Sequence, residues 1–157
     1  MEIVEVKNKK QAKLFLDVAR IIYRGDDTWV CPLDEELESV FDPSRNVFFK
    51  HGDATRWILY DSAGNAAGRV AAFIDENTAG QQDRPTGGMG FFECINDEKA
   101  AHLLFDTARD WLKERGMEAM DGPINFGETD KYWGLLVDGF THPSYEIAYN
   151  HPWYREL

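Results

Sequence analysis

Residues 96–116 read NDEKAAHLLFDTARDWLKERG and decide the fold. Their apolar side chains recur at helical spacing, which predicts one long amphipathic helix. Asn96 or Asp97 is placed to cap the first turn, and Gly116 follows a basic last turn as the terminator. The side chains on the predicted inner face are Ala101, Leu104, Phe105, Ala108, Trp111 and Leu112.

Strand patterns lie on both sides of this helix, at 89–94 and 117–120. Because a helix separates the two strands, we expect them to be parallel. Upstream, residues 54–61 and 68–74 flank a turn at 62–65 and predict an antiparallel hairpin. The N-terminal elements are expected to be a strand at 2–7, a helix that starts at Asn8 and ends before Gly25, and a short acidic helix that reaches Phe41.

The remaining segments have weaker patterns. Residues 76–88 contain hardly an apolar side chain and predict an exposed, mobile loop. Leu135, Leu136 and Val137 are expected to be buried, residues 145–149 to form a last strand, and residues 151–157 to begin a helix at Pro152. Neither an internal repeat nor a domain boundary interrupts the pattern, so residues 1–157 are interpreted as a single domain.

Composition and charge argue against several classes of protein. The 157 residues carry a formal net charge of -11, whereas a nucleic-acid-binding protein needs Lys and Arg to neutralise phosphates. The two cysteines, Cys31 and Cys94, are too few for a disulfide framework, and the histidines show no metal-ligand spacing. The N-terminus lacks a signal pattern, and no apolar run approaches membrane-spanning length. We therefore expect a cytoplasmic protein with no metal and no nucleic-acid or membrane partner.

The order of these elements, together with AGRVA at 67–71, resembles the GNAT superfamily of N-acetyltransferases. Four phrases also resemble an uncharacterised group of bacterial GNAT-like proteins, namely GDDTWV (25–30), GFFEC (90–94), DGPINF (121–126) and GLLVDGF (134–140). The resemblance implies an α/β fold whose mixed, mostly antiparallel sheet is flanked by helices. It also implies transfer of an acyl group to an amine, with acetyl-CoA or another acyl-CoA as the donor.

The sequence departs from the GNAT pattern in two ways. The family's glycine loop, whose amides and helix N-terminus hold the CoA diphosphate, corresponds here to CINDEK at 94–99. This stretch has no glycine, and Asp97 and Glu98 place negative charge at the helix N-terminus, so we expect acetyl-CoA to bind weakly or not at all. The second departure is length. The helix that follows the fifth strand in the family has only begun at Leu157, and we expect the fold to be incomplete at the C-terminus.

The resemblance assigns candidate roles to particular residues. Glu93, at a strand end beside Phe91 and Phe92, is the candidate general base, because partial burial raises the pKa of a carboxyl group. An exposed or ion-paired carboxylate is the alternative interpretation of Glu93. Tyr154 corresponds to the tyrosine that protonates the departing thiolate, or it packs against a partner. The candidate ligand-binding residues are Asn125 after the parallel strand, Cys94 and Ile95 at the loop, and Trp133 in the C-terminal part.

Three functions remain open from the sequence. They are an acyl-CoA-dependent N-acyltransferase, a non-catalytic binding or assembly domain, and a module that binds another small molecule. We also expect a homodimer joined through the C-terminal third, because an uncovered strand edge and exposed apolar side chains would otherwise promote aggregation. A two-fold contact or an exchange of C-terminal segments would cover these surfaces. A monomer that closes its own sheet is the alternative.

Overall fold

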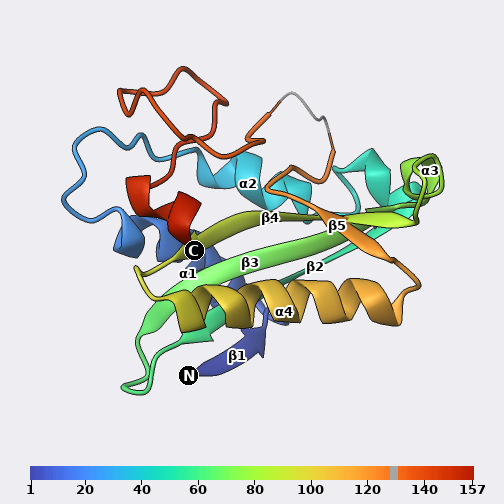
Figure 1. The fold of residues 1–157 in the computed structure, drawn as a ribbon, viewed down its shortest axis with the longest axis horizontal. Helices are drawn as coiled ribbons and strands as arrows, with labels where there is room; N and C mark the ends of the chain where they lie inside the picture. The colour runs from blue at the N-terminus through green and yellow to red at the C-terminus, as the bar shows by residue number, and fades with distance from the viewer. Residues whose placement is uncertain (128–130) are drawn as a thin grey trace.

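The computed structural model describes residues 1–127 and 131–157 (Figure 1). Its strands are β1 (Glu2–Glu5), β2 (Gly52–Tyr60), β3 (Ala66–Asp75), β4 (Thr86–Cys94) and β5 (Ala119–Asp121), and they form one sheet in that order. The first four strands pair antiparallel, and β4 pairs with β5 in parallel. The predicted mixed, mostly antiparallel sheet is therefore confirmed, as is the parallel pair on either side of the long helix.

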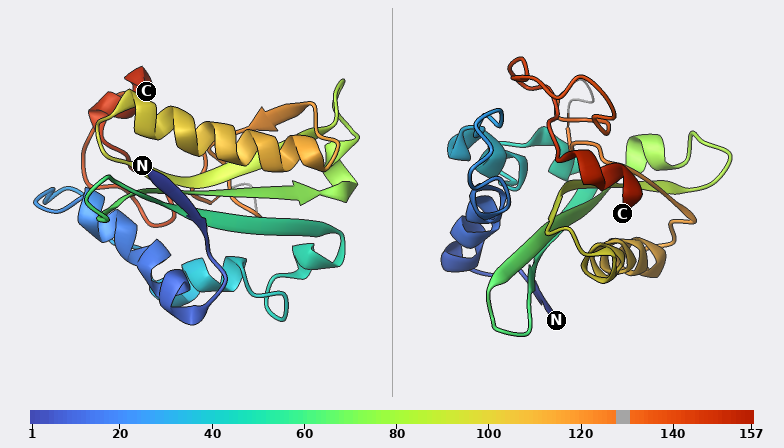
Figure 2. Two further views of the ribbon diagram at one scale, coloured as in Figure 1. Left: turned by 90° about the horizontal axis from the view of Figure 1, so that it is seen from below. Right: turned by 60° about the vertical axis from the view of Figure 1, so that its left-hand side comes forward.

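Helices cover both faces of the sheet. They are α1 (Lys9–Ile22), α2 (Asp34–Val40), α3 (Glu76–Ala79) and α4 (Glu98–Glu114), with 3-10 turns η1 (Val47–Lys50) and η2 (Pro152–Glu156). Figure 2 shows α4 on one face and α1 with α2 on the other. The alternation of β3 creates these two layers, because Val70 packs in the cluster under α4 while Ala71 packs in the cluster under α1.

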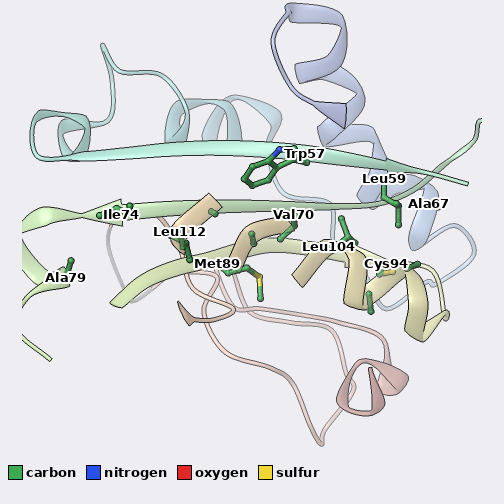
Figure 3. Packing of buried hydrophobic residues seen from close by; sticks show 14 residues of the cluster. Trp57, Leu59, Ala67, Val70, Ile74, Ala79, Met89, Cys94, Leu104 and Leu112 are labelled. Carbon is green, nitrogen blue, oxygen red and sulfur yellow. The ribbon is translucent and has the colours of Figure 1, made fainter. Parts of the chain in front are cut away.

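The long helix α4 is fixed by local signals and by its packing. The carboxylate of Asp97 accepts a hydrogen bond from the Ala100 amide, which caps the first turn as predicted. Leu104 and Leu112 are 0% and 2% exposed against the sheet (Figure 3). A Cβ atom at Gly87 would lie 2.4 Å from Leu112 Cδ2, so glycine on β4 allows the helix to approach closely.

A bulge in β4 sets the direction of the side chains near its end. The register passes from Ala71 opposite Gly90 to Arg69 opposite Glu93, which leaves one more residue on β4 than on β3. Phe91 lies inside this bulge with a φ of 53°. Residues directly opposite each other in an antiparallel pair project from the same face. The bulge therefore places the Glu93 side chain beside that of Arg69, on the face covered by α1.

The parallel pairing of β4 with β5 is short. The register ends with Gly88 opposite Asp121, and one further hydrogen bond of 2.9 Å joins the Ile124 amide to the Met89 carbonyl. A Cβ atom at Gly90 would lie only 1.9 Å from the Ile124 carbonyl oxygen, so this contact requires glycine. Beyond this point, among the described residues, no strand pairing joins β4 to the segment after β5, and the sheet is open at the end of β4 that carries Glu93.

Three expectations about irregular segments were wrong. Residues 76–88 are not one exposed loop, because α3 occupies their start and β4 begins at Thr86, which is buried. Residues 145–149 form no strand, because Glu146 adopts a φ of 63° that extended backbone does not allow. Leu135 and Val137 are 39% and 56% exposed, because positive-φ glycines on both sides hold their stretch in a surface loop.

The C-terminal segment, defined here as residues 131–157, packs back onto α1 (Figure 1). The His151 ring stacks between Tyr23, at 4.6 Å between centroids, and Trp153, at 3.9 Å, and its Nε2 lies 3.1 Å from the Ile22 carbonyl oxygen. Tyr154 is 6% exposed and packs on its own chain, so a partner is not needed to bury it. In the described ranges, none of the helices is both long and apolar enough for a membrane span.

Candidate functional site

A cavity of about 610 Å³ opens where β4 separates from the segment after β5. Its walls come from distant parts of the chain, namely the end of β4, residues 29–33, residues 122–125 and residues 143–150. In Figure 1 the blue loop before α2 and the orange-to-red C-terminal segment lie along the same side of β4. Most of the lining side chains are apolar or aromatic, as in sites that bind small molecules.

The polar groups of the cavity gather at the end of β4. Glu93 Oε1 lies 3.5 Å from a terminal nitrogen of Arg69, and the two side chains are 12% and 5% exposed. The other Arg69 terminal nitrogen donates a 3.0 Å hydrogen bond to the Phe15 carbonyl oxygen, and the Phe15 ring lies 5.0 Å from the guanidinium carbon. Glu93 is thus buried and lies beside the Arg69 guanidinium, which is compatible with either a structural ion pair or the predicted general base.

Tyr154 completes this group from the C-terminal segment. Its hydroxyl donates to Glu93 Oε2 over 2.9 Å and accepts a hydrogen bond of 2.9 Å from the Cys94 amide. The packing of His151 and Trp153 against the end of α1 holds this part of the chain in place. One hydroxyl therefore connects the carboxylate to the backbone of the strand that carries it.

Burial dominates the electrostatics of this group. Desolvation raises the pKa of Glu93, and the Arg69 guanidinium offsets part of that rise. The pKa of Tyr154 is raised by burial and by the Glu93 carboxylate, and the pKa of Tyr23 is raised for the same reasons. Burial lowers the pKa of Arg69. Both tyrosines therefore keep their protons at neutral pH, and Glu93 is a stronger base than an exposed carboxylate.

The structure brings some of the sequence candidates together and separates others. Glu93, Tyr154 and Asn125 all line the cavity. Cys94 is fully buried behind it, and burial raises the pKa of its thiol to about 12, so the thiol stays protonated. Ile95 packs against the cluster under α4, and Trp133 is 59% exposed outside the cavity wall.

The loop before α4 presents groups that are already engaged. The Cys94 amide donates to Tyr154, the Ile95 amide donates to the Ala67 carbonyl over 3.0 Å, and the Asp97 carboxylate caps the helix. A CoA diphosphate placed here would meet the carboxylates of Asp97 and Glu98. These residues do not fit a diphosphate.

Several cavity residues were not singled out from the sequence. Arg69 is the most informative, because a charged residue within a run of buried strand residues needs a partner. That signal was present in the sequence, but its partner depends on the register of the bulge. Within residues 1–127 and 131–157, no group of three or more His, Cys, Asp or Glu side chains is arranged to hold a metal ion.

Comparisons with known proteins identify the fold. A protein of Caulobacter vibrioides (strain NA1000 / CB15N), named bacterial ceramide synthase, is 30% identical over 155 residues, which is 98% of this chain. The chain spans 40% of the length of that relative. A GNAT-family acetyltransferase from Staphylococcus aureus Mu50 superposes with a TM-score of 0.53 at 13% identity, covering 78% of this chain and 72% of the other. No family model matches the chain. The chain has a GNAT-like fold.

Proposed function

We propose that this chain is part of an N-acyltransferase, which moves an acyl group from a thioester to an amine. The observation that carries this function is the buried Glu93 carboxylate, which lines an apolar cavity between Arg69 and Tyr154. Two comparisons support it, the GNAT-like fold and a relative named bacterial ceramide synthase. A ceramide is an N-acylated amine, so a synthase of that name forms an amide bond.

In this function Glu93 is the general base. An amine reaches the site mostly as an ammonium ion and must lose a proton before it can attack. A carboxylate whose pKa is raised by burial accepts that proton more readily than an exposed carboxylate. The apolar side chains of Phe91 and Phe92 line the cavity with Glu93, and low polarity around a charge pair strengthens the attraction between an ammonium and Glu93.

Tyr154 is the general acid. The neutral amine attacks the thioester carbonyl, and the carbon–nitrogen bond forms. The carbon–sulfur bond then breaks to release a thiolate, and the nitrogen loses its second proton to water as the amide forms. Tyr154 passes its proton to the thiolate while it takes the proton that Glu93 received, through their 2.9 Å hydrogen bond, so the proton comes in net from Glu93. Protons and electrons balance in this sequence, and no further reactant is needed. Asn125, which also lines the cavity, is a candidate to bind an amide or carbonyl group.

The test measures thiol release from acyl-CoA in the presence of an amine. The chain should release thiol only when both substrates are present, and Glu93→Gln should slow release by about 10²–10⁴-fold, as for loss of a general base. Glu35→Gln is the matched control, because the Glu35 side chain is 82% exposed outside the cavity. Full activity in Glu93→Gln, or the absence of release with any acyl-CoA and amine pair, would refute this function.

The engaged amides before α4 favour a second function, a binding domain without catalysis. In that case a ligand of the cavity should stabilise the chain without being converted. A ligand present at 100 times its dissociation constant should add about 2.7 kcal/mol to the free energy of unfolding. Thermal unfolding with acetyl-CoA, longer acyl-CoA and free amines, followed by product analysis, separates the two functions.

A further inference from the structure

The cavity has a polar inner end and an apolar mouth. Glu93 and Arg69 are nearly enclosed at its inner end. Toward the solvent its walls are formed by Val30, Leu33, Tyr145 and Ile147, which are 55%, 62%, 67% and 55% exposed. An apolar path thus runs from a charged group to the surface, and a ligand that fills it needs a polar head and an apolar chain.

The charges at the inner end favour a cationic head over an anionic one. Glu93 is the more exposed member of the pair, and Tyr154 supplies one of its hydrogen bonds. Arg69 is committed, because one terminal nitrogen donates to the Phe15 carbonyl and the other faces Glu93. Its Nε is fully enclosed and has no partner in the described chain, so a ligand in the cavity does not reach it. An ammonium head can donate hydrogen bonds to the Glu93 carboxylate, whereas a carboxylate or phosphate head would be repelled by it.

The loop before α4 adds a second, independent observation. Its amides are engaged, and it offers no fit for a diphosphate, so the nucleotide part of an acyl-CoA has no binding site there. The cavity volume of about 610 Å³ is within the range of about 300–1,000 Å³ typical of small-molecule sites. The cavity is therefore available to bind the amine that accepts the acyl group.

On the basis of the proposed function, we propose that the cavity binds the acceptor, a single-chain alkyl amine whose head lies at Glu93 and whose chain runs out past Leu33 and Ile147. The acceptor site then lies in this chain, and the acyl donor binds elsewhere than at the start of α4. Each methylene buried in the cavity should tighten binding about fourfold, until the chain reaches the mouth.

The experiment is calorimetric titration of the chain with hexylamine, octylamine and decylamine below their micelle concentrations. Octanol and octyl sulfate are matched ligands of equal length with neutral and anionic heads. We expect affinity to rise about fourfold per methylene, and octylamine to bind more tightly than octanol and octyl sulfate. Glu93→Gln should remove the preference for octylamine over octanol and leave octanol binding unchanged.

Two tryptophan variants test the location. Ala148→Trp fills the cavity wall and should abolish binding of all three amines, whereas Ala63→Trp, in an exposed turn outside the cavity, should leave it unchanged. Ser144→Trp obstructs the cavity from another position and gives the same test if Ala148→Trp unfolds.

Opposite results overturn the inference. The inference is wrong if the affinity for amines does not depend on chain length, or if octyl sulfate binds as tightly as octylamine. It is also wrong if free CoA binds with a micromolar dissociation constant and Asp97→Lys changes that binding. Failure of the proposed function gives a different result. If amines bind as expected but no thiol is released, the amine-binding site is supported and the catalytic function is refuted.

Discussion

Replacing Tyr154 by phenylalanine removes one hydroxyl from the inner end of the cavity and leaves the ring in place. The hydroxyl accepts from the Cys94 amide and donates to Glu93, each over 2.9 Å. Phenylalanine keeps the edge-to-face contact with Phe92, whose ring centroid lies 5.4 Å away. The change in stability therefore reports on the hydrogen bonds and not on lost packing.

The magnitude follows from two groups that lose a partner. A buried amide without an acceptor costs about 1–3 kcal/mol, and the bond to a charged carboxylate contributes about 1.5–3 kcal/mol. Because both bonds share one hydroxyl and Arg69 still faces Glu93, these contributions are not fully additive. We expect Tyr154→Phe to lower the free energy of unfolding by about 2–4 kcal/mol.

Urea unfolding followed by circular dichroism measures this change. The midpoint should fall while the slope with denaturant stays constant, because the surface exposed on unfolding is nearly unchanged. Tyr145→Phe is the control for an exposed hydroxyl. It loses a hydrogen bond to Glu36, but Tyr145 is 67% exposed and water can replace that bond, so its effect should stay within about 0.5 kcal/mol. A loss below about 0.5 kcal/mol in Tyr154→Phe would show that this hydroxyl is not held as described.

Three further predictions concern the core, the charge of the site and the assembly. Leu104→Ala should destabilise by about 2–5 kcal/mol in the same assay, because Leu104 is fully buried under α4, while exposed Leu33→Ala should change little. Burial raises the pKa of Glu93, so its contribution to stability is fully present below the unfolded-state pKa of about 4.3 and is lost as pH rises through the folded-state pKa. The stability of the wild type relative to Glu93→Gln should therefore fall as pH rises from about 4, and an increase would contradict a raised pKa. The expected dimer should be seen in sedimentation equilibrium of the wild type. The double variant Trp133→Ser, Val137→Ser should be a monomer, because both side chains are exposed and apolar. A wild type that stays monomeric at high concentration rules the dimer out.

The helices and strands of the sheet were predictable because their signals are local. Asp97 caps α4 and Gly116 follows it with a positive φ, and both signals can be identified within the helix sequence itself. Asn8 likewise accepts from the Gln11 amide at the start of α1. Where the signal was local, the boundaries lay within a few residues of those observed.

The C-terminal segment was not predictable in the same way. The alternation of residues 145–149 is typical of a strand, but a strand needs a neighbour, and Glu146 turns the backbone out of the extended region. The burial of Tyr154 depends on contacts with Tyr23 and Cys94, which are far away in sequence. Arg69 meets Glu93 only because of the bulge in β4, and such a register shift leaves no clear trace in the sequence.

The hydrogen bond from the Cys94 amide to the Tyr154 hydroxyl has a consequence for how the chain opens. An amide in a sheet ladder exchanges its hydrogen with solvent when the sheet separates, but this amide is protected by a side chain from the C-terminal segment. If that segment detaches as a cooperative unit of its own, the Cys94 amide should exchange faster than amides near Val70 in the middle of β3. The exchange rate of the Cys94 amide hydrogen would then measure the fraction of time for which Tyr154 is hydrogen-bonded to Glu93.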